Sequence, residues 1–175
     1  MLDLEDICLL MIRGNNEHYN HWINNWINGY PIVQVAVIDY SKHTQDQSRQ
    51  LIDKVYSRLD SVFVVAHGIG CVAFADWFFY ADIDAQRRIQ GAILANPDRE
   101  TWQDDETFCA NRVKFPFPTY MISASGDNED KTVWVRQKAQ NLNAKHLISP
   151  NTPNLNANIG SWQWGMKLMQ EILLS

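Results

Sequence analysis

The arrangement of apolar residues along the chain constrains its fold more than any other feature. Short, nearly continuous apolar runs, such as Ile7–Ile12 and Val62–Val65, alternate with longer amphipathic stretches. A strand of a parallel sheet needs such a run because helices cover both of its faces. The repeated order of strand and then helix therefore predicts an α/β fold, a three-layer α/β/α sandwich with a mainly parallel sheet of about six strands.

The expected elements extend along the whole sequence. Strands are expected over Ile7–Arg13, Val33–Asp39, Val62–His67, Gly91–Asn96, Thr119–Ser125 and Lys145–Ser149. Helices are expected over Tyr19–Asn28, Thr44–Leu59, Ile69–Tyr80, Thr132–Leu142 and Ser161–Leu174. Between them, Pro97–Pro118 forms a long connection of the kind that is commonly functional or mobile. No repeat or linker divides the sequence, so residues 1–175 are predicted to form one domain.

Composition and charge exclude several classes of function. The net charge of −5 over 175 residues is opposite to the clustered basic charge of a nucleic-acid-binding protein. No apolar run approaches the length of a membrane span, and the acidic pair Glu5-Asp6 argues against a signal peptide. The three cysteines lack zinc-site spacing and favour free thiols in a reducing compartment. We therefore expect a cytoplasmic protein without a metal or a cofactor. We also expect it to bind a protein partner or a small ligand, whose identity the sequence does not give.

One segment combines a buried strand, a tight turn and the start of a helix. It extends from Val62 to Ala75, with Gly68 at the apex of the turn. Ala66 and Gly70 are small enough for the strand and the helix to approach closely. In α/β-hydrolases this arrangement is the nucleophile elbow, with the pattern G-x-S-x-G and a serine at the apex. Glycine has no side chain that attacks a carbonyl, so the sequence predicts an intact turn without the reactive atom.

Further motifs follow one another in a fixed order along the chain. They are Arg13–Asn16, His21-Trp22, Trp26, Tyr30-Pro31, Asp39, His67–Cys71, Phe115–Pro118, Gly126–Asn128 and Pro153–Asn156, then Gly160, Trp162 and Gly165. As an ordered set they resemble the small single-domain serine hydrolases of the retinoblastoma-binding-protein-9 type, over nearly the whole chain. The resemblance implies an α/β-hydrolase fold and a Ser–His–Asp catalytic triad.

The same resemblance assigns the triad positions, and two of them carry residues without the required chemistry. The family nucleophile falls on Gly68, and the general base falls on Asn154, whose amide cannot accept a proton from a serine. The family acid lies in the acidic turn after the fifth strand, where Asp127, Asn128 and Asp130 are alternatives. Because triad members act together, the chain is expected to be a catalytically inactive pseudo-hydrolase that serves as a binding or interaction module.

Other side chains offer alternative chemistry. Cys71 or Ser125 as an unrecognised nucleophile would make the chain an active esterase or hydrolase. A buried structural thiol is the favoured interpretation of Cys71, because it lies one helical turn past the apex on the face expected to pack on the sheet. His67 is expected to point away from the apex as a structural histidine. For His18 and His21, lining the pocket and capping the first helix are both open.

The backbone donors of the elbow do not depend on the nucleophile. In this fold the oxyanion hole uses the N–H of the residue after the nucleophile and one from the loop after the first strand. The substitution at the apex removes neither donor, and a helix N-terminus attracts anions. The pocket is therefore predicted to bind a small anionic or acyl ligand. Candidate contacts are Gly14, Asn15, Trp22 and Ile69.

Overall fold

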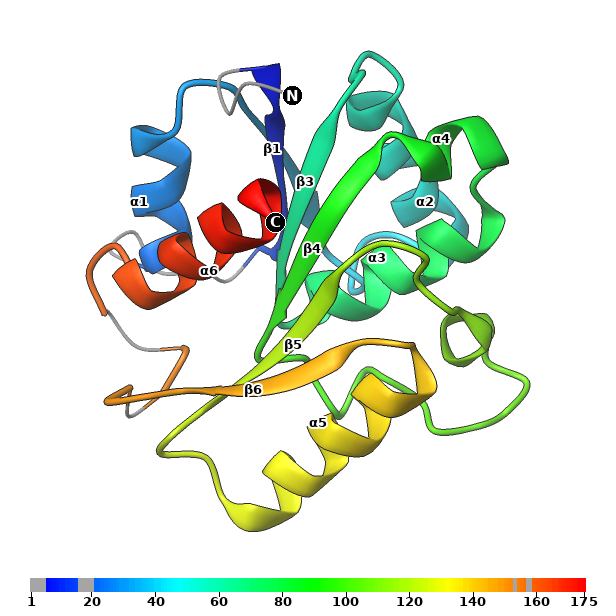
Figure 1. The fold of residues 1–175 in the computed structure, drawn as a ribbon. Helices are drawn as coiled ribbons and strands as arrows, with labels where there is room; N and C mark the ends of the chain where they lie inside the picture. Colours follow the sequence, from blue (N-terminus) through cyan, green and yellow to red (C-terminus); the bar gives the residue numbers. More distant parts are fainter. Residues whose placement is uncertain (1–5, 16–20, 153, 157–158) are drawn as a thin grey trace.

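The computed structural model describes residues 6–15, 21–152, 154–156 and 159–175, and its centre is a six-stranded sheet (Figure 1). The strands are β1 (Cys8–Gly14), β2 (Val33–Ile38), β3 (Val62–His67), β4 (Ile89–Ala95), β5 (Thr119–Ala124) and β6 (Lys145–Ser149). They lie in the order β2-β1-β3-β4-β5-β6, and every neighbouring pair is parallel. The predicted parallel sheet is therefore confirmed.

Helices cover both faces of the sheet. They are α1 (Trp22–Gly29), α2 (Gln45–Tyr56), α3 (Ile69–Tyr80), α4 (Ile83–Arg87), α5 (Glu129–Asn141) and α6 (Gln163–Leu174). Figure 1 shows α1 and α6 on one face, with α2, α3 and α5 on the other. The short α4 is an addition to the expected set. Helix α5 begins before the expected Thr132, because the Asn128 side chain accepts a hydrogen bond from the Lys131 N–H and caps the N-terminus of the helix.

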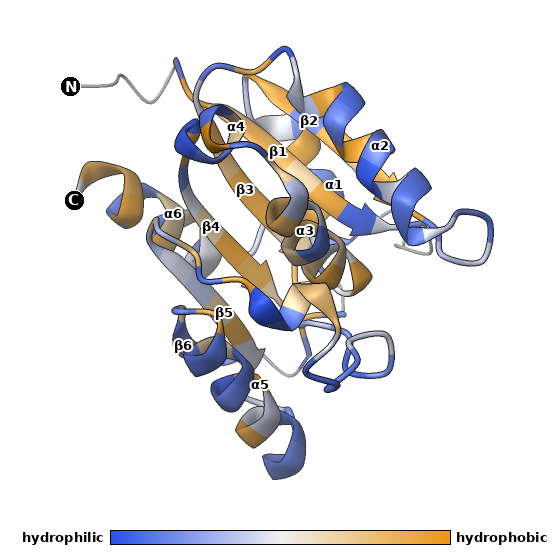
Figure 2. Ribbon diagram, turned by 90° about the vertical axis from the view of Figure 1, so that its right-hand side faces the viewer, coloured by the Kyte–Doolittle hydropathy of each residue, from blue (hydrophilic) through white to orange (hydrophobic). Residues whose placement is uncertain are grey.

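The apolar runs form two core layers, one on each side of the sheet. In β1, Leu10 and Ile12 pack toward α2 and α3, whereas Leu9 and Met11 pack toward α1 and α6. All four side chains have zero exposure. Figure 2 shows the central strands as hydrophobic along their length, which explains why the sequence shows continuous apolar runs rather than alternation.

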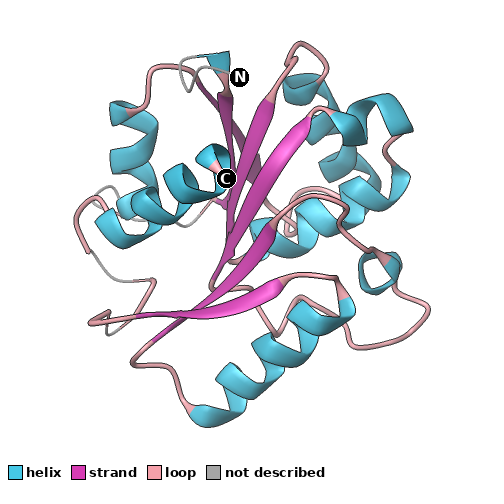
Figure 3. Cartoon of the chain, in the orientation of Figure 1, coloured by secondary structure: helices cyan, strands magenta, loops and turns pink. Residues whose placement is uncertain are grey.

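The long connection Pro97–Pro118 leaves the carboxyl end of β4. Figure 3 shows it mainly as loop, with a short 3₁₀ helix over Cys109–Arg112. Ligands of open α/β sheets bind at this carboxyl edge. In the part of the chain described, no helix is long and apolar enough to cross a membrane.

Candidate functional site

The predicted elbow is present at the carboxyl end of β3. Gly68 joins β3 to α3 with φ 59° and ψ −123°. L-residues that carry a side chain adopt this backbone conformation only under strain. Its N–H donates to the Ala95 carbonyl (3.2 Å), and its carbonyl accepts from the Asp98 N–H (3.3 Å). The turn is thus held against the end of β4.

The second glycine of the elbow has a different function from the apex. A Cβ added at Gly70 would lie 2.0 Å from the Ile12 carbonyl oxygen, so only glycine allows α3 to lie this close to β1. A Cβ added at Gly68 would meet nothing within 4 Å. The elbow therefore has room for a nucleophilic side chain at its apex but does not carry one.

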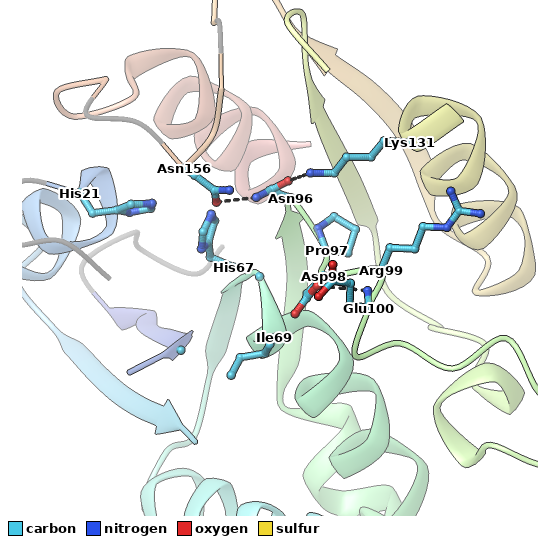
Figure 4. Close-up of a pocket in the computed structure, with 12 residues that line it drawn as sticks. His21, His67, Ile69, Asn96, Pro97, Asp98, Arg99, Glu100, Lys131 and Asn156 are labelled. Carbon is cyan, nitrogen blue, oxygen red and sulfur yellow. Dashed lines mark hydrogen bonds between the residues drawn. The ribbon is translucent and has the colours of Figure 1, made fainter. Parts of the chain in front are cut away.

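A cavity of about 490 Å³ opens beside this apex (Figure 4). It is lined by Gly14, His21, His67, Gly68, Ile69, Asn96, Pro97, Asp98, Arg99, Glu100, Lys131 and Asn156. Among the residues that the structure describes, no serine, threonine or cysteine lines it. The Ile69 N–H lies in the first turn of α3, where backbone donors have no partner within the helix.

A chain of hydrogen bonds forms one wall of the cavity. The Lys131 ammonium donates to Asn96 Oδ1, and Asn96 Nδ2 donates to Asn156 Oδ1 (2.6 Å). An ammonium group only donates, so it fixes the orientation of the Asn96 amide and, through it, that of Asn156. Asn96 is 6 % exposed and has a left-handed backbone (φ 49°), a strained state for a residue other than glycine. This chain joins the end of β4, the first turn of α5 and the loop before α6.

Two histidines form another part of the lining. The rings of His21 and His67 lie 4.6 Å apart, centroid to centroid, in an edge-on arrangement. His21 also caps α1, because its Nδ1 accepts from the Ile23 N–H (3.3 Å). His67, expected to be a structural histidine that points away from the apex, is 3 % exposed and also lines the cavity. Its side chain follows the β3 face that packs toward α1, and at the end of the strand this face borders the cavity. His18 lies outside the described residues.

Carboxylates stand at the Ile69 side of the cavity. Asp98 accepts hydrogen bonds from the Thr101 hydroxyl (2.8 Å) and from the Glu100 N–H (3.2 Å). Figure 4 shows Asp98 and Glu100 near Ile69, away from the asparagine and lysine wall. The two carboxylates balance the positive charges of Lys131 and Arg99, so the cavity carries no formal net charge from these four residues. A ligand is therefore held by individual hydrogen-bond donors and not by an excess of positive charge.

The residues assigned to a vestigial triad lie in different settings. Asn154 is exposed and does not line the cavity, and its Oδ1 accepts from the Asn156 N–H (2.8 Å). The side chain that reaches the cavity is that of Asn156. Asp127 Oδ2 accepts from the Ala124 N–H (3.0 Å) and closes its own turn. Lys131, which follows this turn, is the residue of the segment that faces the cavity.

Of the four expected ligand contacts, Gly14 and Ile69 line the cavity, whereas Asn15 and Trp22 do not. Asn15 is exposed and donates to Asp39 Oδ2 (2.7 Å). Trp22 is fully buried beneath α6, with its Nε1 donating to the Leu155 carbonyl (3.1 Å), because its face of α1 supplies the core.

The alternative nucleophiles also lie away from the cavity. Cys71 has zero exposure, and its thiol donates to the Ala95 carbonyl (3.5 Å) within the core beneath α3. The Ser125 hydroxyl donates to the Thr152 carbonyl (2.7 Å) and accepts from its N–H. Within the described ranges, no cluster of three or more His, Cys, Asp or Glu residues has the geometry of a metal site.

Sequence reasoning missed Asn96, Lys131 and Asn156 as site residues. One signal was available, because Asn96 directly follows the β4 strand at the sheet edge where ligands bind. The family resemblance brought the segments that carry Lys131 and Asn156 to the site, but it assigned their positions there to neighbouring residues, Asp127, Asn128 or Asp130 and Asn154.

Comparison with known proteins agrees with this geometry. The structure of a putative YdeN-like hydrolase from Pectobacterium atrosepticum superimposes with a TM-score of 0.76 at 16 % identity, covering 96 % of this chain and 91 % of that one. Est1E from Butyrivibrio proteoclasticus superimposes with a TM-score of 0.61 at 12 % identity, covering 95 % of this chain and 86 % of that one. A thioesterase domain from the curacin biosynthetic pathway superimposes with a TM-score of 0.58 at 13 % identity, covering 95 % of this chain and 90 % of that one. These likenesses show the α/β-hydrolase fold.

The search of curated proteins found no match. The profile of the serine hydrolase family, in contrast, matches residues 9–171, from the first strand to the last helix. That span includes the elbow, the cavity and the loop before α6. The chain therefore belongs to the serine hydrolase family.

Proposed function

We propose that this protein is a catalytically inactive serine-hydrolase scaffold that binds a small acyl compound and releases it unchanged. The observation that carries the proposal is Gly68, which keeps the strained backbone of the elbow and open space above it but no reactive atom. A triad also needs a base in reach of the nucleophile, and the loop before α6 presents the amide of Asn156 instead.

The cavity suits an oxygen acceptor. The Ile69 N–H at the start of α3 supports hydrogen bonding to a carbonyl oxygen, whereas Asp98 and Glu100 nearby disfavour a carboxylate at that position. On the opposite wall, Lys131 and the amide of Asn156 offer donors to a second polar atom. A compound with an acyl group offers hydrogen-bond acceptors to these donors. We expect no acyl-enzyme of the serine-hydrolase kind, because no serine, threonine or cysteine lines the cavity among the residues that the structure describes.

A second candidate function follows from the histidine pair. An imidazole beside the cavity is a suitable general base for a water molecule, so His67 favours a hydrolase that attacks its substrate with water instead of a side chain. Both functions use the same cavity, but only the second predicts turnover.

Turnover and covalent labelling decide between the two candidates. The purified protein is incubated with a fluorophosphonate probe and with p-nitrophenyl acetate. We expect no labelling and no hydrolysis above the protein-free control. Saturable hydrolysis that His67→Gln abolishes would establish the water mechanism and overturn the proposal. Labelling that Cys71→Ala or Ser125→Ala removes would overturn it in favour of a side-chain nucleophile.

Binding is measured separately, by calorimetric titration with acetate and acetamide. Replacing Lys131 with Met removes a donor to the wall, and we expect binding to weaken by roughly tenfold. Lys42→Met is the matched control, because Lys42 is exposed and does not line the cavity. Equal affinity in both variants, or no binding by the unaltered protein, would contradict the proposed binding site.

A further inference from the structure

A second cavity of about 360 Å³ lies between the N-terminus of α2, α3 and the long connection after β4. Its lining is Tyr40, His43, Thr44, Gln45, Val72, Glu100, Thr101, Gln103 and Phe108. Tyr40 and Phe108 pack partly against the core, and Val72 belongs to it. The cavity thus has an apolar floor of Tyr40, Val72 and Phe108, with polar side chains around them.

This second cavity adjoins the first one. Glu100 lines both. Ile69, which lines the first cavity, and Val72, which lines the second, are three residues apart on α3 and therefore lie on one helix face, about 5–6 Å apart. The two cavities are therefore neighbours along α3.

The charges around the two cavities determine which end of an elongated ligand lies in each cavity. The donors, Lys131 and the Ile69 N–H, belong to the first cavity. The Ile69 N–H lies beside Asp98 and Glu100 and suits a neutral carbonyl oxygen, whereas Lys131 suits a carbonyl or a carboxylate oxygen. The second cavity contains no lysine or arginine among its lining residues, and the Glu100 carboxylate stands at its junction with the first. A carboxylate group is therefore disfavoured in the second cavity, whereas an uncharged hydrocarbon chain is accepted by its floor.

From this arrangement we infer that the two cavities form one cleft for an elongated acyl compound. Its carbonyl end lies at Gly68, and its hydrocarbon chain lies over Tyr40, Val72 and Phe108. The inference rests on the proposed function, since it uses the same carbonyl position, and it adds that chain length determines affinity. The acyl group is the shared chemistry, whether it belongs to a free acid or to a neutral amide.

Affinity along a chain-length series tests this inference. Acetate, butyrate, hexanoate and octanoate are titrated into the full chain by calorimetry, in parallel with the four corresponding amides. We expect the Kd to fall by roughly fourfold for each methylene group that becomes buried, in at least one of the two series. The series that shows this fall identifies the head group, acid or amide.

A pair of variants locates the hydrocarbon chain. Phe108→Ala removes part of the apolar floor, and Phe79→Ala is its matched control, a half-buried phenylalanine that packs on the same core but lines neither cavity. We expect Phe108→Ala to flatten the dependence of Kd on chain length and leave acetate and acetamide binding unchanged. Phe79→Ala should preserve the dependence. Circular dichroism and thermal unfolding first establish that both variants fold.

The outcomes separate the inference from the proposed function. If the short compounds bind but longer chains bind no tighter, the inference is overturned and the proposed function stands. If longer chains bind tighter in both variants alike, the chain lies elsewhere and the inference is again overturned. If neither short nor long compounds bind, the proposed function itself fails.

Discussion

Replacing Gly70 with Ala tests how the elbow is built. The added Cβ would lie 2.0 Å from the Ile12 carbonyl oxygen and 2.6 Å from its carbonyl carbon, whereas carbon and oxygen atoms ordinarily approach to about 3.3 Å. Relief of this overlap requires a shift of more than about 1 Å, by a central strand or by α3. Ile12 belongs to β1, which is hydrogen-bonded to β2 and β3, so neither neighbour yields easily.

The expected loss in free energy of unfolding is about 3 kcal/mol, at the upper end of overpacking effects because the clashing atom is backbone. For a chain of this length that loss lowers the Tm by roughly 10 °C. Urea titration followed by tryptophan fluorescence measures it. Gly29→Ala is the control, since Gly29 lies at the end of α1 with nothing within 4 Å of its added Cβ. That variant should be neutral or stabilised by up to about 1 kcal/mol.

A Gly70→Ala variant with an unchanged urea midpoint and slope would refute the reasoning. It would mean that α3 lies further from β1 than described, and the elbow would lose its structural basis. If Gly70→Ala and Gly29→Ala lose the same free energy of unfolding, the loss comes from the added methyl group in general and not from its contact with Ile12.

The remaining predictions concern catalysis and pH. Gly68→Ser combined with Asn156→His should gain measurable p-nitrophenyl acetate hydrolysis while each single variant stays near background, because triad members act as a unit. The Lys138 ammonium beside Asp104 lowers the pKa of that carboxyl, so the pair stabilises the fold above the ordinary pKa of aspartate and less as the pH falls through the lowered value. The difference in urea midpoint between the protein and Lys138→Met should therefore shrink in acid. Burial, with Arg136 nearby, lowers the pKa of His146, whose ring bonds the Ser123 hydroxyl (2.9 Å). Stability should fall as the pH drops below the ordinary histidine pKa, and His146→Gln should remove that part of the decline.

The sequence determined the fold because its signals are local. The run Val62–Ala66 is apolar throughout, and with His67 it forms a central strand with the predicted bounds, because a strand covered on both faces favours a continuous apolar run. The helix Ile69–Tyr80 also has the predicted bounds, since the glycine apex ends the strand and begins the helix. The absence of a nucleophile at Gly68 was equally visible, because it depends on one residue type at one position.

The composition of the site was decided by the tertiary structure. Asn96 and Asn156 are 60 residues apart in sequence, and their hydrogen bond exists only because β4 and the loop before α6 meet at one sheet edge. Family resemblance placed the base at Asn154, but the side chain that faces the cavity is two residues further on, since loop conformation rather than alignment sets direction. The orientation of His67 likewise depends on which face of β3 borders the cavity. Such contacts between distant segments follow from packing, which no local pattern encodes.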